Sequence, residues 1–164
     1  MRGGRRSLDM VLALAFVAAL AGLAVLMRGE DVSGRARVVD GDTLDLGGVR
    51  IRLKGLDAPE LAQLCHRGGA SYRCGDVARD ALRDLARPEM SCRISGEDRW
   101  RRSLAVCRVG GEDVGATLVR RGLAVAFGAY EAEERLARER RDGLWAGTFD
   151  RPAAWRRQHG IAAL

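Results

Sequence analysis

The sequence V-V-D-G-D-T-L-D-L-G-G-V-R-I-R-L-K-G-L-D-A-P-E, from Val38 to Glu60, predicts the centre of a β-sheet. Residues 35–40 and 43–46 are strand-like, and after the pair Gly47-Gly48 residues 49–56 alternate apolar and basic side chains. Alternation with a period of two is typical of a half-buried strand, and consecutive glycines suit a tight hairpin turn. The stretch therefore predicts three consecutive antiparallel strands.

The rest of the chain adds helices and a second hairpin. Helices are predicted over 76–86, 114–121 and 131–142, a hairpin over 90–95 and 103–109, and a short strand over 123–127. This order predicts an α+β fold, a five-stranded barrel of OB-fold type with about three helices. We expect the domain to cover residues 35–147, with a C-terminal tail over 148–164.

An apolar run over residues 10–27 follows three arginines within Met1–Arg6. As a helix the run is about 27 Å long, close to the ~30 Å hydrocarbon core of a bilayer. Its small-residue pairs lie inside the run, which favours an uncleaved signal anchor over residues 1–29, followed by a linker over 30–34. The basic N-terminus predicts an inner-membrane anchor with the domain facing the periplasm, or a secreted domain if the signal is cleaved.

Four cysteines in the segment predicted to be exported indicate a disulfide framework. If the hairpin is symmetric about its polar tip, Cys92 faces Cys107, because cross-strand partners keep a constant index sum. Cys65 and Cys74 then close the glycine-rich loop between them. The alternative, a zinc site from Cys65, His66 and Cys74, lacks an evident fourth ligand and a close C-x-x-C pair.

Composition and charge limit the classes of function. The 164 residues, 47% hydrophobic and 30% charged, fit one globular domain with one appended segment and exclude a multidomain enzyme. Of the formal net charge of +6, half lies in residues 1–29, which leaves +3 over residues 30–164. This is a mild bias toward polyanions, far from a histone-like coat.

Two acidic clusters bracket the first strands, Asp40 and Asp42 at the first bend and Asp57 and Glu60 at the exit. Because the strands between them fold back, both clusters are expected at one end of the sheet. Carboxylates within about 5 Å repel one another unless a cation shares them, which predicts a hard metal ion. Arg52, between the clusters, can hold a phosphate. The alternative is that the clusters are ordinary turn and helix-start sequences.

These motifs together resemble the staphylococcal nuclease, or thermonuclease-like, family and its exported bacterial members. The resemblance rests on the two motifs of residues 38–60 and on D-R-W-R-R-S-L-A, L-V-R-R-G-L-A and D-G-L-W-A, in this order up to Trp145. It implies an OB-fold barrel and Ca²⁺-dependent hydrolysis of phosphodiester bonds in single-stranded or unwound DNA and RNA.

The resemblance also implies a set of metal ligands and a base. Asp42, Asp57 and the backbone carbonyl of Ala58 match the family's calcium ligands. Asp40 is expected next to these ligands without binding the ion directly. Glu60 matches the carboxylate that positions or deprotonates the attacking water.

The same comparison assigns the substrate-binding side chains. Arg52 and Arg102 match the two arginines that grip the scissile phosphate, where guanidinium groups stabilise the charge of the transition state. Tyr130 matches a tyrosine near the nucleotide, and substrate contacts are predicted for Trp100 and Arg101 as well.

The hairpin tip departs from the family pattern. Where the family usually has D-x-Y-G-R, this chain has Trp100 and Arg101 in place of the tyrosine and the glycine. The pattern R-x-L-A aligns with Arg102 to Ala105 and gives the catalytic position to Arg102.

The departure leaves two alternatives to catalysis: a non-catalytic nucleic-acid or protein-binding module, and an accessory protein of envelope or exopolysaccharide assembly. No obligate protein partner is predicted, and the N-terminal helix is expected to contact the membrane.

Overall fold

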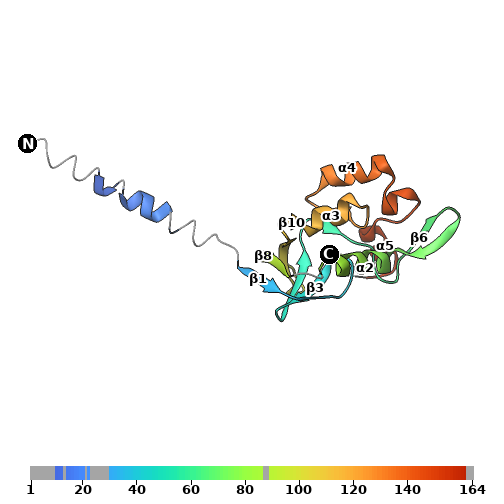
Figure 1. Ribbon diagram of the computed structural model, residues 1–164, viewed down its shortest axis with the longest axis horizontal. Coiled ribbons are helices and arrows are strands. Elements are labelled where there is room, and N and C mark those ends of the chain that lie inside the picture. The colour runs from blue at the N-terminus through green and yellow to red at the C-terminus, as the bar shows by residue number, and fades with distance from the viewer. Residues whose placement is uncertain (1–9, 13, 21, 23–29, 87–88, 162–164) are drawn as a thin grey trace, which may run out of the picture. The chain divides into compact units, whose positions relative to one another are not determined.

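Figure 1 shows the computed structural model, which describes residues 10–12, 14–20, 22, 30–86 and 89–161. The chain divides into two compact units, Met1–Glu30 and Asp31–Leu164. In the first unit the described residues 10–12, 14–20 and 22 are helical, and the rest of the predicted 10–27 span lies outside the described residues. Within the described part, no helix is both long enough and apolar enough to cross a membrane.

The second unit alternates strands and helices in an α+β order. Its elements are β1 Asp31–Gly34, β2 Ala36–Val38, β3 Thr43–Leu46, β4 Val49–Leu53, β5 Leu56–Asp57, β6 Leu64–Arg67, β7 Ala70–Arg73, α2 Cys74–Leu85, β8 Met90–Glu97, β9 Ser103–Val109, β10 Glu112–Asp113, α3 Val114–Arg120, β11 Val125–Ala126, α4 Glu131–Arg140, the 3₁₀ helix η1 Gly143–Ala146 and α5 Pro152–Gln158.

The main sheet is curled, as in an OB-type fold. Its strand order is β1-β8-β9-β4-β3-β2, and β10 pairs with β9, which gives seven strands. The five predicted barrel strands are all in this sheet, and β1 comes from the segment expected to be a linker. The short strand predicted over 123–127 is β11, which pairs with β5 outside this sheet. A Cβ added at Gly47 would lie 3.5 Å from Val32 Cγ1. The edge strand β1 therefore reaches the turn between β3 and β4, although the two are not neighbours in the strand order.

Strand pairing gathers three segments at one end of the sheet. In the β3–β4 hairpin Thr43 pairs with Arg52, and Gly47 and Gly48 form the turn with φ angles of 58° and 85°. Strand β4 then runs parallel to β9, with Arg52 beside Leu104. The first acidic bend, the exit of β4 and the tip of the β8–β9 hairpin are neighbours for this reason.

Both predicted disulfides are present. Strands β8 and β9 place Cys92 opposite Cys107, and these residues are bonded. Cys65 and Cys74 form the second bond, and the glycine-rich loop between them is an antiparallel hairpin of β6 and β7. The zinc alternative is wrong, because two of its three proposed ligands are oxidised to a disulfide.

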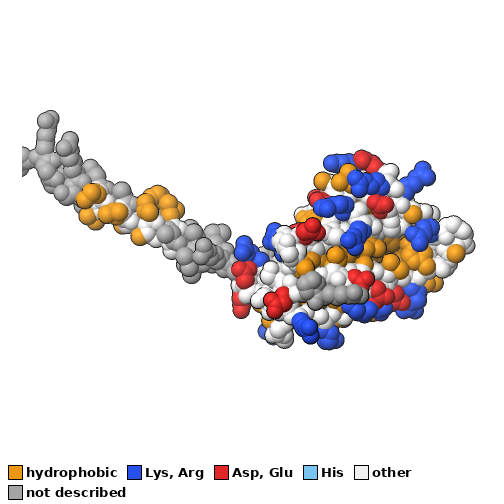
Figure 2. Space-filling model, viewed as in Figure 1, with side chains coloured by type: hydrophobic (Ala, Val, Ile, Leu, Met, Phe, Trp, Pro, Cys, Tyr) orange, Lys and Arg blue, Asp and Glu red, His pale blue; other side chains and the backbone are white. Residues whose placement is uncertain are grey.

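The helices cover the sheet and close the core. Helix α2 buries Ala78 and Leu82, and α3 begins at Asp113, whose carboxylate accepts a hydrogen bond from the backbone N–H of Ala116 at 3.0 Å. The largest fully buried aliphatic side chains are Leu44, Leu46, Ile51, Leu53, Leu56, Leu82 and Leu118. On the face drawn in Figure 2, basic side chains are interspersed with acidic ones, as expected from the small net charge of this unit.

Helix α5 lies in the segment predicted to be a tail. Pro152 stands at its first turn, where the missing N–H costs nothing, and Trp155 and Arg156 are buried. Two backbone hydrogen bonds of 2.9 Å join His66 and Thr148, just before this helix. The C-terminal segment is thus an integral part of the domain.

Candidate active site

The two acidic clusters meet, as the sequence predicts. Asp42 accepts a hydrogen bond from the backbone N–H of Ala58 at 3.0 Å, and Asp42 and Asp57 are both buried. A Cβ added at Gly41 would lie 2.7 Å from Ala58 Cβ and 2.9 Å from Ala78 Cβ. Only a glycine allows this close approach, so the D-G-D sequence is what brings the clusters together.

Arg52 bridges the two predicted calcium ligands. Its Nη1 donates to Asp42 Oδ1 at 2.6 Å and its Nη2 donates to Asp57 Oδ1 at 3.1 Å, and the side chain is buried. A planar guanidinium between two carboxylates holds both in a fixed relative position. In this structure Arg52 therefore contacts the carboxylates, whereas a phosphate contact stays a prediction.

Negative charge exceeds positive charge at this end of the sheet. Burial is the main cause that raises the pKa of Asp42 to about 7; the charge of Arg52 opposes the rise, and the charge of the nearby Asp40 adds to it. The backbone N–H of Asp42 donates to Asp40 Oδ1 at 3.0 Å, which keeps the two residues in one turn. A raised carboxylate pKa at a buried site means that the anion lacks sufficient compensation, which favours a cation here.

The donor set suits a hard divalent cation in chemistry and charge. Asp42, Asp57 and Glu60 pair with the guanidinium groups of Arg52 and Arg156, and Asp40 lies beside Asp42, so the formal charge of these six side chains is −2. Carboxylate and carbonyl oxygens are the ligands that Ca²⁺ prefers. Within the described residues, no three His, Cys, Asp or Glu side chains by themselves form a metal-binding group. Arginines stand between the carboxylates, and a cation would have to share oxygens with them.

The second guanidinium is Arg156, which sequence reasoning missed. Its Nη1 and Nη2 donate to Oδ1 and Oδ2 of Asp57 at 3.0 and 2.9 Å, and its Nη1 also donates to Glu60 Oε1 at 2.9 Å. The side chain is 3% exposed. The sequence signal for helix α5 is the proline that follows Arg151, but nothing local marks which of its arginines is buried.

Glu60 stands at the mouth of the site. Its side chain is 33% exposed, and its backbone N–H donates to the buried Gln63 at 3.3 Å. Asp40 and Glu60 are the partly exposed carboxylates beside the buried Asp42 and Asp57, so both have access to water. The role of Glu60 as a base stays a prediction.

At the hairpin tip the structure separates Arg102 from Arg101. Arg102 Nε donates to Asp98 Oδ2 at 2.7 Å, and its Nη1 lies 3.5 Å from the Thr43 hydroxyl, beside Asp42. Although partial burial opposes it, hydrogen bonds from Arg102 and Trp100 lower the pKa of Asp98. Arg102 therefore points toward the acidic cluster, whereas Arg101 is exposed.

Arg101 also explains the glycine of the family pattern. Its φ of 63° lies in the left-handed region, where a glycine has no steric cost. Trp100 is 42% exposed, and the guanidinium carbons of Arg99 and Arg102 lie 4.3 and 5.2 Å from its ring centroid. Trp100 is next to Arg102, Arg101 is exposed at the tip, and the substrate contacts of both stay predictions.

Tyr130 has a structural partner away from the acidic cluster. Its hydroxyl donates to both carboxylate oxygens of Asp113 at 3.1 and 3.2 Å. Partial burial and the charge of Asp113 raise the pKa of the Tyr130 hydroxyl above its ordinary value. The residue lines a pocket whose other lining residues lie outside the acidic cluster, and its role at the nucleotide stays a prediction.

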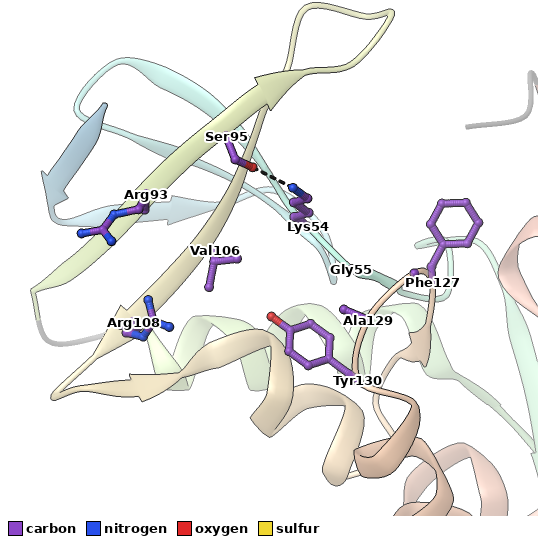
Figure 3. Close-up of a pocket in the computed structure, with 10 residues that line it drawn as sticks. Lys54, Gly55, Arg93, Ser95, Val106, Arg108, Phe127, Ala129 and Tyr130 are labelled. Carbon is purple, nitrogen blue, oxygen red and sulfur yellow. Dashed lines mark hydrogen bonds between the residues drawn. The ribbon is translucent and has the colours of Figure 1, made fainter. Parts of the chain in front are cut away.

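This pocket, of about 470 Å³, is lined by three basic side chains, Lys54, Arg93 and Arg108. Lys54 follows Arg52 by two residues, and its Nζ donates to Ser95 Oγ at 3.0 Å. In Figure 3 the ring of Tyr130 points toward Val106 and Arg108. The pocket thus combines positive charge with an aromatic wall.

The structure has a curled OB-type sheet with carboxylates and arginines gathered at one end, so the protein is of the α+β class with an OB-type fold. Comparison with known proteins identifies its family. The family model of the staphylococcal nuclease homologues matches residues 50–147. The chain belongs to this family, which confirms the resemblance seen in the sequence.

Individual relatives agree with the family match. The chain is 37% identical over 126 residues to the succinoglycan biosynthesis protein ExoI of Rhizobium meliloti (strain 1021), covering 71% of this chain and 65% of that protein. It is 28% identical over 153 residues to an uncharacterized endonuclease of Haemophilus influenzae, covering 85% and 80%. It is 32% identical over 115 residues to the probable staphylococcal-like nuclease CAN4 of Oryza sativa subsp. japonica, covering 65% and 21%.

Proposed function

We propose that this chain hydrolyses phosphodiester bonds of DNA and RNA with the help of Ca²⁺. The observation that carries the proposal is the meeting of Asp42, Asp57, Arg52 and Glu60 at one end of the sheet, with Arg102 approaching from the hairpin tip. A protein that only binds nucleic acid does not need a general base. A partly exposed carboxylate beside a buried cluster of arginines and carboxylates therefore favours catalysis.

The proposed metal site uses the ligands that the sequence predicts. The carboxylates of Asp42 and Asp57 and the carbonyl of Ala58 would hold the ion, with Asp40 supporting Asp42 through its backbone. When bound, Ca²⁺ supplies positive charge that polarises the phosphate and offsets the negative charge of the carboxylates.

Side chains of this protein supply the base and the other positive charges that the reaction needs. Glu60, a partly exposed carboxylate of the cluster, accepts the proton of the attacking water. The bond from phosphorus to the leaving sugar oxygen breaks, and that oxygen takes a proton from solvent. As water attacks, negative charge grows on the phosphate oxygens, and the fixed guanidinium of Arg102 stabilises that charge because Asp98 holds it in place. Arg52 fixes the two predicted metal ligands and contributes positive charge beside them.

The basic pocket supports a polyanionic substrate. Lys54 and Arg108 offer phosphate contacts, and Tyr130 offers a ring face at the same place. In single-strand binding, basic side chains follow the backbone while aromatic rings stack on bases. A strand that leaves the acidic cluster past Lys54 would enter this pocket.

The proposed location is outside the cytoplasm, with the N-terminal segment as membrane anchor. Two disulfides support an oxidising compartment, and the arginines before the apolar run support the orientation. Labelling of an introduced N-terminal cysteine from either side of intact cells would test the orientation.

The experiment that tests the function is incubation of the purified full-length chain with single-stranded DNA and RNA, with Ca²⁺ or with a chelator. Cleavage only in the presence of Ca²⁺ is expected. One alternative is favoured by a particular observation: the Rhizobium relative is named as a succinoglycan biosynthesis protein, which suggests an accessory role in exopolysaccharide assembly. A chain that leaves both nucleic acids intact under all conditions, while its deletion reduces exopolysaccharide, would support this alternative.

A further inference from the structure

Helix α5 brings a positive charge into the acidic cluster from the far end of the chain. Arg156 contacts both oxygens of Asp57, a residue 99 positions earlier, and one oxygen of Glu60, 96 positions earlier. One guanidinium group thus touches a predicted metal ligand and the predicted base at the same time.

Arg156 is the residue that orients Glu60. Within the described part of the chain, it is the one side chain that donates a hydrogen bond to the Glu60 carboxylate. Because Glu60 is partly exposed, its carboxylate would otherwise rotate freely in solvent. A charge-assisted hydrogen bond from a buried partner restricts that rotation.

The position of Arg156 is itself fixed by the packing of its segment. Gln63, which is fully buried, donates from Nε2 to the carbonyl of Asp150 at 2.7 Å, two residues before the helix begins. Trp155 is buried beside Arg156, and its ring stacks on His159 with centroids 3.9 Å apart. The guanidinium is therefore held in place by the fold.

The contact between Arg156 and Asp57 also disfavours the binding of a cation at Asp57. Asp57 accepts three hydrogen bonds from guanidinium groups, one from Arg52 and two from Arg156. A positive charge about 3 Å from a metal ligand repels a divalent ion and occupies oxygens that the ion would share. Removal of Arg156 would leave the carboxylates with a greater excess of negative charge.

We propose that Arg156 is a positioning residue with two opposed effects: it orients Glu60 for proton transfer, and it weakens the binding of a divalent cation at Asp57. The inference rests on the proposed function, because it needs a cation at the cluster and a base at Glu60. It differs from a purely structural role, in which loss of Arg156 would lower stability, metal affinity and turnover together.

The test compares Arg156→Gln and Arg156→Lys with Arg157→Ala in the full-length chain. Arg157 is exposed on the same helix, so its substitution is the matched control. Calorimetric titration with Ca²⁺ alone gives the metal affinity, hydrolysis of single-stranded DNA at saturating Ca²⁺ gives kcat and KM, and thermal unfolding reports on the fold.

In Arg156→Gln we expect Ca²⁺ to bind about tenfold tighter while kcat falls about 10- to 100-fold and KM changes little. Arg156→Lys keeps the charge without the planar fork, so Ca²⁺ affinity stays near that of the wild type while kcat is still reduced. Arg157→Ala behaves as the wild type in all three measurements.

Two results would overturn the inference alone: a folded Arg156→Gln protein whose Ca²⁺ affinity is unchanged or weaker, or one whose kcat is unchanged. If Arg156→Gln fails to fold, Arg156→Lys decides, since wild-type kcat in that variant contradicts the orienting role. A folded wild type that neither binds Ca²⁺ nor cleaves DNA overturns the proposed function, and the inference with it.

Discussion

Substitution of the two adjacent arginines at the β8–β9 tip should have very different effects. Arg102 points toward Thr43 and the acidic cluster, whereas Arg101 is exposed with a φ of 63°. We expect Arg102→Ala to lower turnover by about 10²- to 10³-fold, or about 3–4 kcal/mol of transition-state stabilisation, because one fixed donor is lost.

The cost to folding should be much smaller. Arg102→Ala removes a partly exposed ion pair with Asp98, which contributes up to about 1 kcal/mol. The backbone N–H groups of Trp100 and Arg102 still bind the Asp98 carboxylate, so the tip keeps its shape. The loss of rate therefore exceeds what unfolding accounts for.

Arg101→Gly is the matched control. A residue with a side chain costs about 1–2 kcal/mol in the left-handed region, and glycine costs about 0.5–1 kcal/mol in lost entropy, so this change should leave stability equal or up to about 1 kcal/mol higher. Turnover should be nearly unchanged. The assay is hydrolysis of a fluorogenic single-stranded oligonucleotide with Ca²⁺, together with urea unfolding of each variant. The geometry described for the tip would be refuted if Arg101→Gly lowered turnover more than Arg102→Ala does. It would also be refuted if Arg102→Ala left the turnover of an active enzyme unchanged.

Other predictions follow from the same geometry. Glu60→Gln should lower kcat by about 10²- to 10⁴-fold without weakening Ca²⁺ binding, as rate and calorimetric measurements would show. Asp42→Ala should weaken Ca²⁺ binding in the same titration while circular dichroism stays native; equal cleavage by chelated and Ca²⁺-loaded wild type would contradict the metal assignment. Replacement of the Cys92–Cys107 disulfide by alanines should reduce the free energy of unfolding by about 3 kcal/mol, the chain-entropy value for a loop of 15 residues, in urea denaturation. Arg108→Ala should lower the slope of log affinity against log salt by about 0.7 for single-stranded DNA and leave kcat alone; an unchanged slope would exclude a phosphate contact.

Local patterns in the sequence account for the centre of the fold. The alternation around Gly47-Gly48 predicts the β3–β4 hairpin, and the symmetry of the β8–β9 hairpin predicts the register that joins Cys92 to Cys107. Both features depend on residues close in sequence. A second glycine pair, Gly68-Gly69, carried the same hairpin signal for β6 and β7 and was interpreted as a loop.

Other features depend on contacts between segments that are distant in sequence, so local sequence patterns do not predict them. Strand β1 is short and polar, and it exists only because it pairs with β8. Arg156 is one of 28 basic residues in the chain, and its burial is set by carboxylates almost a hundred positions earlier. The acidic cluster was predicted in place, but the arginine that completes it was not.

The link between Asp57 and Arg156 sets the time at which the site is completed during synthesis. A chain that is still being made contains the whole acidic cluster long before α5 has left the ribosome. Until that last helix folds, Glu60 lacks the partner that orients it. Under the export proposed above, nucleic acids on the side of synthesis would meet only a chain in which Arg156 does not yet contact Glu60, and full activity would arise after α5 has folded on the other side.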